Sequence, residues 1–85
     1  MIYSLFRILP TGKITYHYFT KHPSVSEIQH ILGGYFEPIG DMHSDFLLLA
    51  DEDGLQKGLD PNAIGSQIAG GIVVGPVLVL LFPLE

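Results

Sequence analysis

Three short stretches contain residue types that bind metal ions or phosphates. In DMHSD, the side chains of Asp41, His43 and Asp45 would point to one side of an extended strand. Carboxylates and imidazoles are metal ligands. However, three polar residues in a loop before a strand are more typical of a solvated surface. We therefore expect no metal site and no cofactor.

The other two stretches depart from the motifs that they resemble. DEDG, at 51–54, has its glycine in fourth place, whereas a calcium loop needs glycine in sixth place and a closing bidentate glutamate. A hairpin turn explains this stretch better. GGIVVG, at 70–75, lacks the glycine spacing that cradles a pyrophosphate, and we expect it to link a helix flexibly to a strand.

No arrangement of nucleophile, base and acid is recognisable in the chain. Cysteine is absent, no serine lies in a nucleophile-elbow context, and the paired carboxylates all fall on expected turns. The sequence therefore predicts a protein that is not an enzyme.

Charge is distributed unevenly along the chain. Arg7, Lys13 and Lys21 lie in the first quarter, and most acidic residues follow with only Lys57 among them, giving a net charge of −5. Direct nucleic-acid binding needs clustered basic residues and is not expected. The acidic middle either keeps an apolar protein soluble or forms a surface complementary to a basic partner.

On the second interpretation, the binding residues lie in or beside the acidic middle. Glu37 follows two aromatic residues in an apolar strand, where a charged residue is unusual. Asn62 has a structural alternative, because its side chain is suited to capping a helix or closing a turn. The candidate set is Glu37, Asp41, Asp45, Asp51, Glu52, Asp53 and Asn62.

Local patterns predict the elements that position these residues. Stretches 2–9 and 13–20 form a hairpin, and Ser24 with Glu27 makes a capping box for a helix that ends at Gly33. YFEPIG predicts an edge strand because proline cannot donate to a ladder, and DFLLLAD predicts another strand. Stretch 59–69 predicts a second short helix, capped by Asp60 with Pro61 in its first turn.

The apolar tail GGIVVGPVLVLLFPLE raises the alternative of a membrane anchor. Glycines and prolines interrupt it, and it is shorter than the roughly 20 apolar residues that span a bilayer. We expect the tail to be a central strand. With no signal-peptide pattern after Met1, we also expect a cytoplasmic protein, and 1–85 to be one domain.

The element order β-β-α-β-β-α-β predicts an α+β fold. We expect an antiparallel-rich sheet of about five strands with two short helices on one face.

The ordered segments GGYFE (33–37), ADEDG (50–54), GLDPN (58–62) and GPVLVL (75–80) resemble a small phage- and plasmid-borne family catalogued only as a domain of unknown function. The chain departs from that pattern where Asp60 precedes Pro61. The resemblance implies a mobile-element protein in a bacterial host cell.

We expect this protein to bind and inhibit a host protein, such as a defence nuclease complex with a basic nucleic-acid-binding groove. The alternative is a homo-oligomer that sequesters a nucleotide signal in a pocket between subunits. A homo-oligomer is compatible with the apolar composition, 47% of residues.

Overall fold

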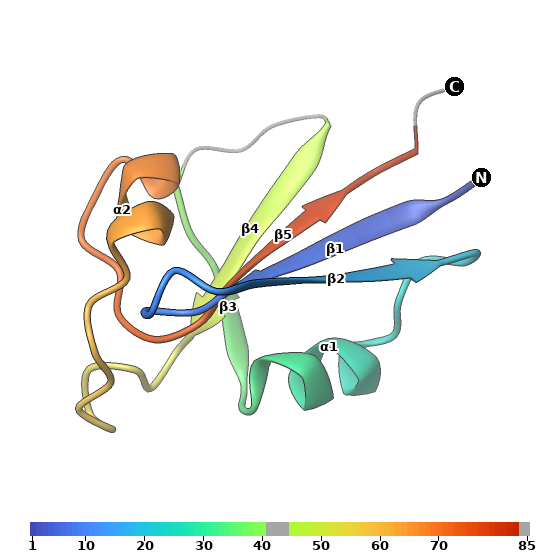
Figure 1. The fold of residues 1–85 in the computed structure, drawn as a ribbon. Helices are drawn as coiled ribbons and strands as arrows, with labels where there is room; N and C mark the ends of the chain where they lie inside the picture. The colour runs from blue at the N-terminus through green and yellow to red at the C-terminus, as the bar shows by residue number, and fades with distance from the viewer. Residues whose placement is uncertain (41–44, 84–85) are drawn as a thin grey trace.

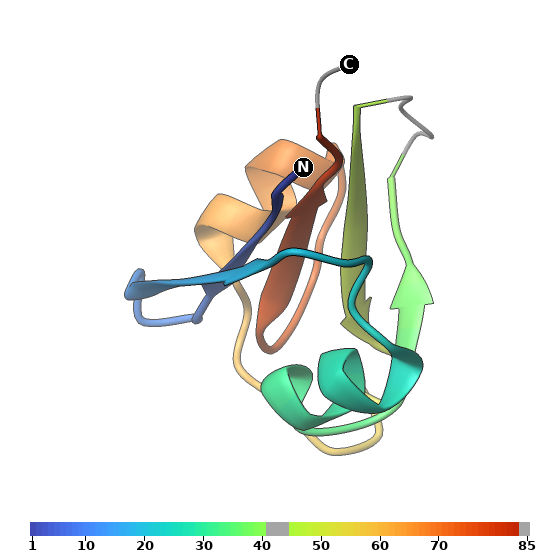
Figure 2. The ribbon, with the colours of Figure 1, turned by 90° about the vertical axis from the view of Figure 1, so that its right-hand side faces the viewer.

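Five strands form one antiparallel sheet in the computed structural model, which describes residues 1–40 and 45–83 (Figure 1). The sheet order is β2-β1-β5-β4-β3, so β2 and β3 are the edges (Figure 2). The elements are β1 (Tyr3–Ile8), β2 (Ile14–Phe19), α1 (Val25–Leu32), β3 (Phe36–Pro38), β4 (Phe46–Asp51), α2 (Ala63–Ala69) and β5 (Val77–Leu81).

The apolar tail forms the central strand of the sheet. Val79 of β5 is paired with Phe6 of β1 on one side and with Leu48 of β4 on the other. Both neighbours run antiparallel to β5. The expectation of a central strand is therefore confirmed. In the described part of the chain, no helix is long and apolar enough to cross a membrane.

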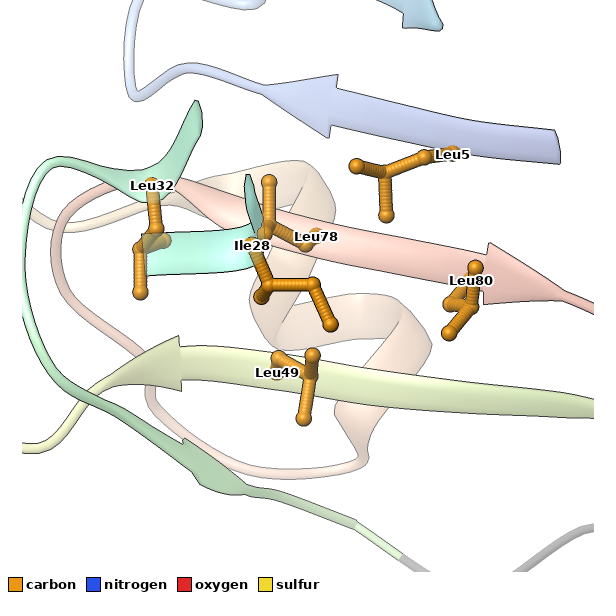
Figure 3. Packing of buried hydrophobic residues seen from close by; sticks show 6 residues of the cluster. All are labelled: Leu5, Ile28, Leu32, Leu49, Leu78 and Leu80. Carbon is orange, nitrogen blue, oxygen red and sulfur yellow. The ribbon is translucent and has the colours of Figure 1, made fainter. Parts of the chain in front are cut away.

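Helix α1 covers one face of the sheet, here called the α1 face. Ile28 and Leu32 of the helix pack on Leu78 and Leu80 of β5, flanked by Leu5 of β1 and Leu49 of β4 (Figure 3). Leu78 and Leu80 are two positions apart on β5 and share a face, because alternate side chains of a strand point to opposite faces. These side chains form the main core of the protein.

Helix α2 lies on the opposite face, here called the α2 face (Figure 3). Its Gly65 lies so close to Val77 that a Cβ built on this glycine would be 2.5 Å from a Val77 methyl carbon. Val77 and Leu78 are consecutive on β5, so their side chains point to different faces. The α+β class, the single sheet and the two helices are confirmed, but the expectation that both helices cover one face is wrong.

The two helix starts differ in how well local sequence predicted them. Ser24 and Glu27 form the predicted capping box, and Gly33 ends α1 in the left-handed conformation, with φ 92°. Helix α2 instead begins after Asn62, whose side chain accepts a hydrogen bond from the Gly65 N–H. Asp60 is not the cap, because its carbonyl accepts a hydrogen bond from Gly75 and Pro61 forms a β-bridge with Val74.

Candidate functional site

Asn62 joins three segments of the fold. Its Nδ2 donates to the carbonyls of Ile8 and Gly75, each at 2.9 Å, and its Oδ1 accepts from Gly65 N–H at 2.9 Å. The residue is 1% exposed. A partner therefore has no surface of Asn62 to contact, and we remove Asn62 from the candidate binding set. Its role is the structural one.

Asp51 is likewise turned inward. Its Oδ2 accepts from Lys57 Nζ at 2.6 Å, and its Oδ1 accepts from the Asp53 N–H at 2.8 Å. The side chain of Asp51 is only 4% exposed, whereas that of Lys57 is 41% exposed. Gly34 packs against this pair, since a Cβ there would be 2.8 Å from Lys57 Nζ. Asp51 thus stabilises the turn after β4 and is also removed from the binding set.

The environment of this ion pair changes the ionisation of both groups. Burial by itself raises the pKa of Asp51, but the Lys57 hydrogen bond, the Asp53 N–H and the Lys57 charge outweigh burial and lower that pKa. The hydrogen bond to Asp51 raises the pKa of Lys57. At neutral pH both groups of the pair are therefore ionised, and the negative charge of Asp51 compensates the positive charge of Lys57.

The turn after β4 bounds one side of a cavity of about 310 Å³. Ile39, just after β3, and Ala50 of β4 line it on one side, and Val73 and Val74 line it from the segment between α2 and β5. Glu37 and Glu52 contribute two exposed carboxylates to the same lining. Neither carboxylate forms an ion pair with any residue that the structure describes. The cavity is therefore acidic with apolar walls.

Two large apolar side chains also line this cavity while facing solvent. Leu55 is 83% exposed and Ile72 is 91% exposed. These are the two highest values among the large hydrophobic side chains of residues 1–40 and 45–83. A single exposed leucine or isoleucine is ordinary, but two beside one acidic cavity are typical of a contact surface.

The structure thus divides the predicted acidic set. Glu37 and Glu52 share the cavity, and Asp53 lies half-buried in the same turn. Asp45 lies at the opposite end of β4, where its carbonyl accepts from the Phe82 N–H. Asp41 lies outside the described residues, and so does His43 of the DMHSD stretch. The acidic middle is therefore not one continuous surface.

Some residues of this region were not among the candidates. Lys57 keeps Asp51 ionised by forming an ion pair with it. The sequence indicated this role only through the position of Lys57 as the single basic residue within the acidic middle. Leu55 and Ile72 had no such signal, since exposure of a single apolar residue depends on tertiary packing. The expected hairpin turn at 51–54 is a run of turns that leads out of the sheet toward α2.

Residues 1–40 and 45–83 contain no group of three or more His, Cys, Asp or Glu side chains arranged to hold a metal ion.

A family model described as "Domain of unknown function (DUF3846)" matches residues 7–83 of the 85. The chain belongs to this family. The match covers all the elements of the DUF3846 chain except the start of β1, including the turn, cavity and central strand described above. Neither the curated proteins nor the solved structures contain a match.

Proposed function

We propose that this protein acts by binding, without chemistry of its own, to a cationic surface of another protein. The observation that carries the proposal is the cavity where Glu37 and Glu52 are unpaired and where Leu55 and Ile72 are the most exposed large apolar side chains of the described chain. Interface anchors combine such apolar contacts with charges complementary to the partner.

The expected contact is an arginine or lysine side chain of the partner that enters the cavity. Its alkyl stem would pack on Ile39, Val73 and Val74, and its charged end would meet the carboxylates. Arginine fits better than lysine, because its planar guanidinium can be shared between two carboxylates.

The biological role that we propose is inhibition in the bacterial cytoplasm by a phage- or plasmid-encoded protein. A protein that binds the basic side chains of a nucleic-acid-binding groove in this way covers the groove and excludes nucleic acid from it. A nucleotide is a poor ligand for this cavity, because its lining includes the unpaired carboxylates of Glu37 and Glu52 and no lysine or arginine. The charges of the lining therefore favour a cationic protein surface over the nucleotide-sequestering alternative.

The test is affinity capture from bacterial lysate with two double variants of equal charge. Glu37→Gln/Glu52→Gln alters the cavity, and Asp45→Asn/Asp60→Asn alters exposed acids that do not line it. Each pair raises the net charge from −5 to −3, since two negative charges are removed.

We expect quantitative mass spectrometry to find a basic protein that the wild type and the Asp45/Asp60 variant retain and the Glu37/Glu52 variant loses. Equal retention by the two variants would show that overall charge, not this cavity, determines binding.

A further inference from the structure

The outer edge of β2 carries an open hydrogen-bonding ladder. Leu9 N–H donates to Lys13 O at 2.8 Å, which fixes the alternation of paired and unpaired residues along the β1–β2 hairpin. In that alternation, Thr15 and His17 direct their backbone groups toward β1, and Ile14, Tyr16 and Tyr18 direct theirs outward. Since β2 is the last strand of the sheet in the described chain, these outward groups meet no further strand.

The two faces beside this edge differ in chemistry. On the α2 face, Tyr16 and Tyr18 are 52% and 65% exposed, and their rings are stacked 6.1 Å apart. Ile14 of the same row is 52% exposed. This face therefore offers apolar and aromatic contacts to the side chains of an added strand.

On the α1 face, a groove of about 430 Å³ runs between β2 and α1. His17, Phe19, His30 and Ile31 are among its lining residues.

Three polar atoms beside the groove are buried without a hydrogen-bond partner among the described residues: Thr15 Oγ1, His17 Nε2 and Arg7 Nε. These atoms have almost no exposed area, so an incoming group would reach them only after side chains move. Buried polar groups without partners are rare and call for an explanation.

The charge of this region is net positive, although Glu27 of α1 also lines the groove, where its carboxylate accepts a hydrogen bond from the Ser24 N–H. Every charged residue before Glu27 is basic, and Lys13 and Lys21 are exposed at the two ends of β2. A second copy of this chain, added through its own β2, would bring further lysines, and residues 11–22 contain no carboxylate to pair with them. A strand with acidic side chains is the complementary occupant.

We propose that β2 is a docking edge for an extended acidic segment of another protein, which adds to the sheet as a further antiparallel strand. Ile14, Tyr16 and Tyr18 each offer one N–H and one C=O, so three residues with two groups each provide six backbone hydrogen bonds. This edge is separate from the acidic cavity, and the proposal does not depend on the function proposed above.

The alternation of the strand specifies the side-chain pattern of the occupant. Residues opposite Thr15 and His17 point into the groove on the α1 face, where carboxylates would meet His17 and Arg7. Residues opposite Ile14, Tyr16 and Tyr18 lie against the tyrosine face and should be apolar. The occupant therefore alternates apolar and acidic residues.

The test uses the full chain and a fluorescein-labelled peptide, acetyl-Ser-Val-Glu-Val-Glu-Val-Ser-amide, in a fluorescence anisotropy titration. We expect saturable binding that weakens at least tenfold when both glutamates are replaced by lysine. N-methylation of the central valine, which faces Tyr16, should also weaken binding at least tenfold. N-methylation of a glutamate, whose N–H points away from β2, should leave binding unchanged.

A protein variant tests the same ladder from the other side. Tyr16→Pro removes an outward N–H and leaves the bonds between β1 and β2 in place, so it should abolish binding while circular dichroism stays native. Because the N-methylated peptides need no change in the protein, the test stands even if this variant misfolds.

Equal affinity for the glutamate and lysine peptides would overturn the proposal, as would insensitivity to N-methylation at the central valine. Sedimentation equilibrium that shows a dimer of the free protein, dissociated by Tyr16→Pro, would also overturn it, because the occupant would then be a second copy.

Discussion

Replacing Asn62 by alanine should destabilise the whole domain rather than affect binding. The substitution removes three hydrogen bonds of 2.9 Å from a side chain that is 1% exposed. At about 1 kcal/mol for each bond, the expected loss in the free energy of unfolding is about 3 kcal/mol. A domain of this size has a total of roughly 4–13 kcal/mol, so the variant should still fold.

Urea unfolding followed by circular dichroism measures this loss. With an m-value of about 1 kcal/mol per M, typical of a small domain, the midpoint should fall by about 3 M. Gln67→Ala, on the exposed side of α2, is the matched control and should change stability by less than about 0.5 kcal/mol.

Asn62→Asp separates the two roles of the side chain. It keeps an oxygen to accept from Gly65 but loses both donated bonds and places a charge beside two carbonyl oxygens. We expect it to be at least as unstable as the alanine variant. A loss below about 1 kcal/mol in both variants would refute the view that Asn62 holds these three segments together.

Three further perturbations test the packing, the ion pair and the helix cap. Gly65→Ala should destabilise by about 1–3 kcal/mol in urea, because its methyl group collides with Val77; an unchanged midpoint would contradict the close helix–sheet contact. Because the pKa of Asp51 is lowered in the folded state, its stabilisation is present above about pH 4 and is lost as pH falls through the folded pKa. Lys57→Met should lower the melting temperature at neutral pH and weaken the fall in melting temperature at acid pH, because loss of the lysine raises the folded-state pKa of Asp51 toward its unfolded value; an identical pH profile would count against the pair. Ser24→Ala should lower the free energy of unfolding by about 1 kcal/mol through loss of the capping box, and a wild-type urea midpoint would show that the box is dispensable.

The parts of the fold that the sequence predicted are those set by neighbouring residues. The hairpin, the start and end of α1 and the strand nature of the tail each follow from a pattern within about ten residues. Ser24 finds its capping partner three residues away, so no knowledge of tertiary structure is needed.

The parts that it missed depend on distant segments. The sequence offered both Asp60 and Asn62 as caps, and the choice of Asn62 depends on Ile8 and Gly75, remote in sequence, which accept its other hydrogen bonds. Asp51 was an apparent surface acid, and its burial depends on packing beside Gly34. Helix α2 packs on the face that carries Val77, where Gly65 allows a close approach. From the sequence, that glycine predicted only that the helix would be short and weak.

The central claim is that the cavity beside Glu37 and Glu52 binds a cationic side chain. The most direct measurement is NMR chemical-shift mapping of the ¹⁵N-labelled protein during titration with the peptide acetyl-Leu-Arg-Leu-amide. We predict saturable shifts of the backbone amides of Glu37, Ala50, Glu52 and residues 72–74. Added salt should suppress these shifts. A control peptide in which uncharged citrulline replaces the arginine should cause none. Shifts confined to other regions, or none at millimolar peptide, would contradict the claim.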